Sequence, residues 1–97
     1  MIYELEFKKS ALKEWRKLDS SIREQFKKRL AERLISPHIA SAKLSGMPDC
    51  FKIKLRSAGY RLIYQVFDKR LVIMVIAIGR RNNDLVYRLA QERIKSP

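Results

Sequence analysis

The chain is poor in the residues that most enzymes use for metal binding and acid–base catalysis. Its 97 residues include one cysteine, Cys50, and one histidine, His38, and its ten acidic residues are scattered without clusters. One cysteine excludes an intramolecular disulfide and a multi-cysteine zinc site. The scattered carboxylates do not form the sets that Mg²⁺, Ca²⁺ or a two-metal nuclease requires. We therefore expect no metal, no cofactor, a reducing compartment and a buried structural role for Cys50.

Long apolar stretches and phosphate-binding glycine motifs are also missing. The longest apolar run is the eight-residue stretch "LVIMVIAI", far shorter than the roughly 20 residues that span a bilayer. Met1 is followed by the charged "YELEFKK" rather than by the apolar core of a signal peptide, so we expect a cytoplasmic protein without a membrane partner. No glycine-rich phosphate loop or nucleophile elbow occurs. We interpret His38, which follows Pro37 in a predicted loop, as a surface residue rather than a general base.

Positive charge is abundant and unevenly distributed. The chain has 22 lysines and arginines against ten acidic residues, a formal net charge of +12. Such an excess favours a polyanionic partner, which can be a nucleic acid, an acidic protein or an anionic membrane. Residues 1–34 carry ten cations and six acids, whereas residues 35–97 carry twelve cations and four acids. The second part is therefore the better candidate for a binding site.

Periodicity predicts one α+β domain over residues 1–97. Alternation over residues 2–7 predicts a strand, and apolar spacings of three and four from Ser10 onward predict two helices that form a hairpin. Ser21 and Glu24 fit a capping box at the start of the second helix. Residues 36–49 contain two prolines and a glycine, so we expect a loop there.

The second half of the chain predicts a compact sheet followed by a helix. Apolar runs at residues 51–56, 60–67 and 71–78 predict three strands in an antiparallel meander. Asp84 can cap a C-terminal helix, and we expect all helices to pack on one face of the sheet. The expected apolar stripe of this last helix consists of Leu85, Leu89, Ala90 and Ile94.

The stretch "KIKLRSAGYRLIYQV" concentrates charge of one sign on a predicted hairpin. From Lys52 to Arg61 it contains four cations and no acid. Alternation along a strand places Lys52, Lys54 and Arg56 on one face and the apolar residues between them on the other, while Arg61 begins the next strand. Solubility alone would be served equally well by mixed charges. The pattern therefore favours a cationic RNA-binding surface over a surface that is merely solvated.

Two further features flank this hairpin. The sequence "GRR" places Arg80 and Arg81 directly beyond the last predicted strand, and arginine can bind phosphate in a bidentate manner. Tyr87 lies roughly 200° around the last predicted helix from Leu85, so we expect it to point away from the core. Exposed aromatic rings beside cations stack on unpaired RNA bases. These residues therefore extend the predicted RNA-binding face.

Three segments, "ALKEWRKL", "MPDCFKIKLRSAGYRLIYQV" and "VYRLA", resemble the RelE family of bacterial toxins over nearly the whole chain. The resemblance implies a RelE-like α+β fold and ribosome-dependent cleavage of mRNA in the ribosomal A site, without a cofactor. It also implies a type II toxin–antitoxin system. In such a system a RelB-like antitoxin neutralises the toxin and joins it in operator DNA binding and repression.

The resemblance also implies particular site residues. The family's active-site positions fall on Lys52, Lys54, Arg61, Arg81 and Tyr87. Two positions depart from the family pattern, because Ser45 and Asn83 stand where arginines are usual. We expect these two departures to alter affinity or codon preference and to leave the chemistry intact.

These residues permit metal-independent transesterification, in which the RNA 2′-OH attacks the adjacent phosphate. A base must take the 2′ proton and cations must stabilise the phosphorane. Nearby positive charge lowers the pKa of lysine and tyrosine side chains, so either Lys54 or Tyr87 can be the base, and the choice stays open. We assign Lys52 and Arg61 to the phosphate, Arg81 to the phosphorane and leaving group, and Tyr87 also to base stacking.

Two other functions are compatible with this composition. A ParE-like toxin shares the fold and acts on DNA gyrase, although such relatives generally lack the lysine pair combined with the helix tyrosine. A non-catalytic nucleic-acid-binding subunit, active only as a co-repressor with an antitoxin, would need the basic face and nothing more. The residue pattern favours the ribonuclease over the first and does not separate it from the second.

Overall fold

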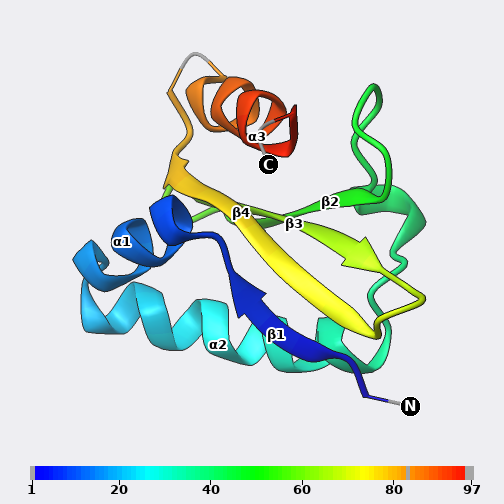
Figure 1. Cartoon of the computed structure of the whole chain (residues 1–97). Helices are drawn as coiled ribbons and strands as arrows, with labels where there is room; N and C mark the ends of the chain where they lie inside the picture. Colours follow the sequence, from blue (N-terminus) through cyan, green and yellow to red (C-terminus); the bar gives the residue numbers. More distant parts are fainter. Residues whose placement is uncertain (1, 83, 96–97) are drawn as a thin grey trace.

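The computed structural model describes residues 2–82 and 84–95. Within them, strands and helices follow the predicted order, from an N-terminal strand through a helical hairpin and a three-stranded meander to a C-terminal helix (Figure 1). The strands are β1 (Glu4–Phe7), β2 (Cys50–Leu55), β3 (Tyr60–Phe67) and β4 (Val72–Arg80). The α-helices are α1 (Lys9–Lys17), α2 (Ser20–Ile35) and α3 (Leu85–Lys95), and a short 3₁₀ helix, η1 (Ala40–Ala42), lies in the predicted loop. No helix among the described residues combines the length and the apolar composition needed to cross a membrane.

The strands form one mixed sheet in the order β1-β4-β3-β2. The pairs β2–β3 and β3–β4 are antiparallel, which confirms the predicted meander, and β1 pairs in parallel with β4. The chain between β1 and the meander is long enough for the return that a parallel pair requires. This order leaves β2, which carries the lysine pair, at one edge of the sheet.

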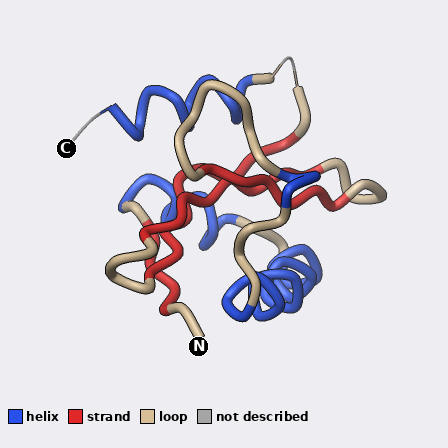
Figure 2. Tube along the Cα trace, turned by 90° about the vertical axis from the view of Figure 1, so that its right-hand side faces the viewer, coloured by secondary structure: helices blue, strands red, loops and turns tan. Residues whose placement is uncertain are grey.

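Helices cover both faces of the sheet, so the expectation of one covered face is wrong. The hairpin α1–α2 packs against one face through a core that includes Phe26 and Leu62. Helix α3 packs against the other face, where Val86 and Ala90 contact a second core that includes Ile63. Figure 2 shows α3 and α2 on opposite sides of the sheet. The reason is that neighbouring residues such as Leu62 and Ile63 are both apolar and fully buried, and a strand apolar on both faces needs cover on both.

Strand β4 contains an irregularity that the sequence pattern did not predict. Its pairing with β3 shifts between Val75 and Ala77, which leaves Ile76 as an extra residue. Ile76 and Ala77, although adjacent in sequence, therefore both contribute to the core under α3. Bulges of this kind redirect the side chains that follow them. On the C-terminal side of this bulge, Gly79 of β4 is paired with Arg61 of β3.

The start of α2 differs from the predicted capping box. The helix begins at Ser20, and Asp19 occupies the N-cap position without a side-chain cap bond. Ser21 therefore lies inside the first turn. Glu24 forms an exposed ion pair with Lys27, with 3.3 Å between Oε1 and Nζ, instead of reaching back to the helix start. The capping box between Ser21 and Glu24 is wrong.

The buried stripe of α3 begins one residue later than predicted, while Leu89, Ala90 and Ile94 pack in or against the core as predicted. Val86 is buried, whereas Leu85 is 52% exposed. Asp84 precedes the helix with a left-handed backbone, φ 59°, and its carbonyl oxygen accepts the amide of Tyr87 at 3.1 Å. Val86 then packs against Gly79, since a Cβ added to that glycine would lie 3.7 Å from the Val86 Cβ. The missing side chain at Gly79 thus favours Val86 over Leu85 on the sheet side.

An ion pair between two helices closes the free edge of β4. Strand β1 pairs with β4 only as far as Val75, so other groups must satisfy the next outward-facing backbone atoms. The Ile78 amide donates to Glu14 Oε1 at 3.0 Å, and Arg93 Nη1 donates to the Ile76 carbonyl at 2.9 Å. Arg93 also donates to both Glu14 oxygens, at 2.8 and 2.9 Å. The Glu14–Arg93 pair therefore joins α1 and α3 across the sheet edge.

Replacing Glu14 by alanine tests this closure. Because the change leaves the half-buried Arg93 charge and the Ile78 amide without their partner, we expect the free energy of unfolding to fall by about 2–4 kcal/mol. Equilibrium urea denaturation measures the loss. In the matched control, Glu24→Ala breaks the exposed pair with Lys27 and is expected to change stability by less than about 0.5 kcal/mol. Equal losses in the two variants would contradict the closing role of Glu14.

Candidate functional site

Three of the predicted site residues line one small pocket on the α3 side of the sheet. The pocket has a volume of about 150 Å³ and is lined by Arg61, Arg81, Asp84, Val86 and Tyr87. Arg61 comes from β3, Arg81 follows β4, and Tyr87 belongs to α3. The fold therefore brings together residues that lie up to 26 positions apart in the sequence.

Arg61 lines this pocket and also has a buried, unsatisfied donor. It is paired across the sheet with Lys54 on one side and with Gly79 on the other. In the described part of the chain its Nε atom is buried and has no hydrogen-bond partner. A buried donor without a partner lowers stability, and a phosphate oxygen is the kind of acceptor that arginine binds strongly. Arg61 is therefore suited to hold an anion at the pocket.

The hairpin turn fixes the backbone at Arg81. The Arg81 amide donates to the carbonyl oxygen of Gly59 at 3.0 Å. Gly59 lies in the turn between β2 and β3 with φ 71°, a left-handed conformation that glycine adopts without strain. The bond ties the end of β4 to the hairpin and leaves the exposed Arg81 side chain next to the pocket.

Tyr87 is held at the wall of the pocket. It is half-buried and packs against the core under α3 while it lines the pocket. The expectation that it points away from the core is therefore wrong in part. The cause is the one-residue shift that places Val86 rather than Leu85 on the sheet, so that Tyr87 lies at the margin of the buried stripe. Its position between the core and the pocket suits stacking on a substrate group.

The two lysines of β2 lie beside this pocket. Both are half-buried, and the apolar residues between them are buried on the α2 side, which confirms the predicted alternation. The positive charge of Lys52, followed by burial and by the charges of Arg61 and Arg56, lowers the pKa of Lys54. Crowding by like charges thus favours the neutral amine of Lys54.

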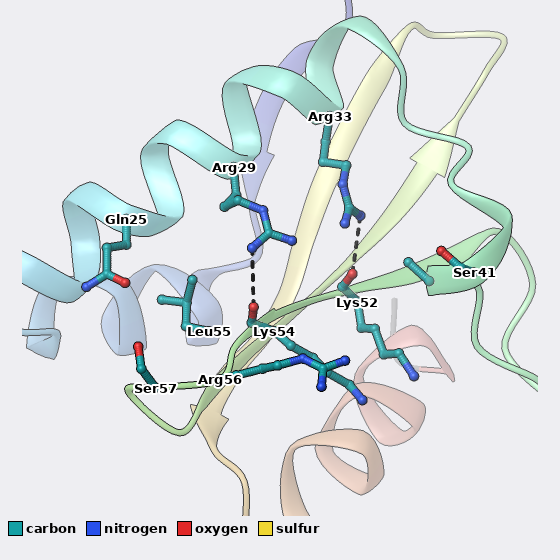
Figure 3. Close-up of a pocket in the computed structure, with 10 residues that line it drawn as sticks. Gln25, Arg29, Arg33, Ser41, Lys52, Lys54, Leu55, Arg56 and Ser57 are labelled. Carbon is teal, nitrogen blue, oxygen red and sulfur yellow. Dashed lines mark hydrogen bonds between the residues drawn. The ribbon is translucent and has the colours of Figure 1, made fainter.

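A larger groove of about 640 Å³ runs along the outer edge of β2 (Figure 3). At this edge the Cys50 carbonyl accepts the Leu44 amide at 2.9 Å. The next two outward carbonyls are capped from α2, because Arg33 Nη1 donates to the Lys52 oxygen at 3.2 Å and Arg29 Nη1 to the Lys54 oxygen at 3.3 Å. The groove is lined by Gln25, Arg29, Arg33, Ser41, Ala42, Lys52, Lys54, Leu55, Arg56 and Ser57.

The sequence pattern missed the contribution of α2 to this region. Three polar residues recur at every fourth position of α2: Gln25, Arg29 and Arg33. Each of them directly precedes an apolar residue that the helical spacing places toward the core. This spacing places them on one side of the helix, at the margin of its buried face. Arg33 is also 92% buried, since its exposed fraction is 8%, and its Nη1 atom donates to the Tyr64 hydroxyl at 2.8 Å. The four-residue spacing was the sequence feature that could have identified these arginines as part of the site.

The structure separates Arg80 from the other predicted RNA-binding residues. Arg80 is the last residue of β4 rather than a residue beyond it. Its guanidinium lies over the Tyr60 ring, 5.1 Å from the centroid, and Tyr60 packs against the core on the α1–α2 face. Arg56, in contrast, lines the groove with the lysines. A contact between Arg80 and RNA stays a prediction without support from the pocket geometry.

The scarce residue types behave largely as expected. Cys50 is fully buried, and burial followed by the charge of Asp49 raises the pKa of its thiol to about 11, which confirms a buried thiol. His38 is exposed, with its Nε2 atom 2.8 Å from Asp68 Oδ1. Among residues 2–82 and 84–95, no group of three or more metal-ligating side chains lies close together.

The two positions that depart from the family pattern have different outcomes. Ser45 is exposed in the turn before β2, and Asn83 lies outside the described residues.

Removing Lys52 tests the electrostatic coupling of the lysine pair. Since Lys52 is the main cause of the lowered pKa of Lys54, we expect Lys52→Gln to raise the Lys54 pKa toward that of an isolated lysine. An NMR titration of the lysine side-chain signals measures the change. Lys28→Gln removes a charge from an exposed position of α2 and is expected to leave the Lys54 pKa unchanged. An unchanged or lower Lys54 pKa in Lys52→Gln would contradict the coupling.

Comparisons with known proteins place this chain in a family. The family model described as "ParE toxin of type II toxin-antitoxin system, parDE" matches residues 5–85. The chain is 58% identical over 94 residues to the mRNA interferase toxin RelE of Escherichia coli K12, covering 97% of this chain and 99% of that protein.

Solved structures show the same relationship. A mutant of the E. coli toxin RelE in the free state superposes with a TM-score of 0.90 at 57% identity, covering 97% of this chain and 99% of that one. RelE from the intact E. coli RelBE toxin–antitoxin complex gives a TM-score of 0.81 at 59% identity, covering 84% of this chain and 99% of that one. The sequence and the fold agree, and the chain belongs to the RelE family of type II toxin–antitoxin toxins.

Proposed function

We propose that this chain is an mRNA interferase: a ribosome-dependent endoribonuclease that cuts mRNA in the ribosomal A site and so inhibits translation. The observation that carries the proposal is the meeting of Arg61, Arg81 and Tyr87 in one pocket beside Lys54, whose pKa is lowered. The relative named mRNA interferase toxin, with 58% identity over almost the full length, supports it.

The reaction is an internal transesterification of RNA. The 2′-oxygen attacks the adjacent phosphorus and forms a new P–O bond, while the bond from phosphorus to the 5′-oxygen of the next nucleotide breaks. The 2′-hydroxyl proton passes to a base, and the departing 5′-oxygen takes up a proton. The products are a 2′,3′-cyclic phosphate and a 5′-hydroxyl, with no water consumed. The two demands on the protein are a proton acceptor and positive charge around the phosphorane.

The site meets both demands with its own residues. The Arg61 guanidinium, which lines the pocket, and the Lys52 ammonium hold the scissile phosphate in our proposal. Arg81 stabilises the phosphorane and the leaving oxygen, and the Tyr87 ring stacks on a base. The lowered pKa of Lys54 favours its neutral amine and so supports it as general base, while the position of Tyr87 at the pocket keeps its hydroxyl as the second candidate.

The size of the pocket supports a requirement for the ribosome. Its 150 Å³ is below the roughly 300–1,000 Å³ of sites that enclose a small ligand. Such a pocket can contact a phosphate but does not fix the sugar and both flanking bases. In-line attack by the 2′-oxygen requires this fixation, which is worth orders of magnitude in rate. We propose that the ribosome supplies it by holding the mRNA in the A site.

The charge of the chain supports the remaining partners. A net charge of +12 and a cationic strand at a sheet edge suit an acidic, partly disordered antitoxin segment that covers the site. We propose a RelB-like antitoxin, in line with the relative solved as a toxin–antitoxin complex. Through that complex the toxin would reach operator DNA and take part in repression. Because ribosomes and operator DNA are both found in the bacterial cytoplasm, we propose that the protein acts there.

A ParE-like action on DNA gyrase is the second candidate, because the matching family model carries the ParE description. Induced expression followed by primer extension on a translated mRNA separates the two. Cuts positioned by codon support the ribonuclease, whereas DNA breaks that depend on gyrase, without mRNA cuts, would contradict it. Absence of both, with operator binding retained in the antitoxin complex, would leave a non-catalytic co-repressor.

Arg81→Ala tests the role assigned to the exposed arginine. We expect cleavage to slow by about 100-fold or more, because the phosphorane loses a cation that the ground state does not need. The assay is single-turnover cleavage on programmed ribosomes at saturating toxin. Binding is measured in parallel with an mRNA that carries a 2′-methoxy group at the cut site and is expected to change much less. The control Lys28→Ala removes a charge on α2 outside the pocket and the groove, and cleavage at saturation is expected to continue at the original rate.

Tyr87→Phe separates the two candidate bases, because it removes the hydroxyl and keeps the ring. We expect a loss of about 100-fold or more in the same single-turnover rate if the hydroxyl transfers a proton, with ribosome binding retained. Cleavage at the original rate would exclude a proton role for Tyr87. Lys54 would then be the sole candidate for the base, and the Tyr87 ring would retain only its stacking role.

A further inference from the structure

The groove along the edge of β2 is a cationic channel that extends beyond Lys52 and Lys54, the two lining residues that the proposed chemistry uses. Five of its lining residues are cations: Arg29, Arg33, Lys52, Lys54 and Arg56, and none of the lining residues is acidic. Figure 3 shows Arg29 and Arg33 reaching from α2 toward β2, while the Lys52 and Lys54 side chains leave β2 on the side away from α2. The groove therefore spans the sheet edge between the α2 side and the α3 side.

The positive charge of this groove is poorly neutralised by the residues that the structure describes. The carboxylate of Glu32 lies 4.0 Å from Arg29 Nε, but its side chain is 75% exposed, so solvent screens the pair. The buried Arg33 guanidinium donates to two neutral oxygens, those of the Lys52 carbonyl and the Tyr64 hydroxyl. Buried charges are usually paired with an opposite charge. An external anion in the groove would supply what the protein lacks.

The groove lies next to the reaction pocket. Lys54 lines the groove and is the direct cross-strand neighbour of Arg61, which lines the pocket. Neighbouring strands are about 4.8 Å apart, which is less than the length of one nucleotide. A polymer that occupies the groove thus reaches the pocket without leaving the protein surface.

The chemistry of the lining selects the ligand. Proteins that bind single-stranded bases use aromatic stacking platforms, and the groove lining includes no aromatic residue. It offers arginine and lysine cations together with the polar side chains of Gln25, Ser41 and Ser57, which can donate to phosphate oxygens. These groups recognise a sugar–phosphate backbone and do not read the sequence.

We propose that this groove binds the phosphodiester backbone of the cleaved RNA strand at nucleotides next to the scissile phosphate. The inference rests on the proposed function, because it assumes that RNA occupies the pocket. Arg29 and Arg56 contact backbone phosphates, and Gln25 and Ser57 donate to them from the two sides of the groove. Arg33 lies beneath as a positioning residue that holds the Lys52 backbone and adds positive potential.

Two RNAs of different length test the groove on the full chain without ribosomes. Both are fully 2′-methoxylated and cannot be cleaved: one of about four nucleotides fills the pocket, and one of about nine nucleotides also fills the groove. Fluorescence anisotropy at low salt measures their affinity. We expect the longer RNA to bind more tightly and its log Kd to rise more steeply with log salt, by about 0.7 for each added phosphate contact.

A matched pair of variants locates the additional contacts. Gln25→Glu/Ser57→Glu places two acids in the groove, whereas Ser20→Glu/Ser21→Glu places two acids on exposed residues of α2 that do not line it. We expect the groove variant to weaken the longer RNA by about tenfold and the shorter one by less than about twofold. The control is expected to weaken both RNAs equally and slightly. Thermal melting verifies that all variants are folded.

Three results would overturn the proposal. The first is equal affinity and equal salt dependence of the two RNAs for the unaltered chain. The second is the same effect of the two double variants on the longer RNA. The third is unchanged RNA binding in the groove variant together with lost antitoxin affinity, which would make the groove an antitoxin site. Cleavage on programmed ribosomes by the unaltered chain is assayed separately, so a failed groove and a failed ribonuclease function are distinguished.

Discussion

The positive charges of the β2–β3 hairpin repel one another, and the site depends on a backbone stiff enough to hold them together. Lys52 and Lys54 lie on one face of an edge strand, and the pKa of Lys54 is lowered by its cationic neighbours. An edge strand alone would offer free carbonyls to solvent or to other chains. Arg29 and Arg33 bind these carbonyls from α2 and so stabilise the strand that carries the lysines.

The other outer strand of the meander, β4, is stabilised in a comparable way by side chains from helices. This stabilisation also positions Tyr87. Glu14 and Arg93 bind the outward backbone groups of β4 and link α3 to α1. Helix α3 then rests on the face where Gly79 leaves room for Val86, with Tyr87 at the margin of the core. Side chains from the helices thus bind outward-facing backbone groups on both outer strands of the meander, β2 and β4.

The sequence predicted the parts of this arrangement that follow from local periodicity. Alternation located the lysine face of β2 and the limits of β3, and the resemblance identified Arg61, Arg81 and Tyr87, which the fold brings to one pocket. The bulge at Ile76 was not predictable, because a continuous apolar run has no alternation to reveal an extra residue. The position of α3 depended on that bulge and on the left-handed Asp84. The arginines of α2 had a visible spacing, but their targets are backbone carbonyls distant in sequence.

The central claim is that these side chains promote attack by an RNA 2′-hydroxyl on its own phosphate. End-group analysis of mRNA cut on programmed ribosomes tests it most directly, with a ribose or a 2′-methoxy group at the cut nucleotide. The account predicts a 2′,3′-cyclic phosphate and a 5′-hydroxyl from the ribose substrate and no cleavage of the 2′-methoxy substrate. Products with a 3′-hydroxyl and a 5′-phosphate, or cleavage of the 2′-methoxy substrate, would contradict it.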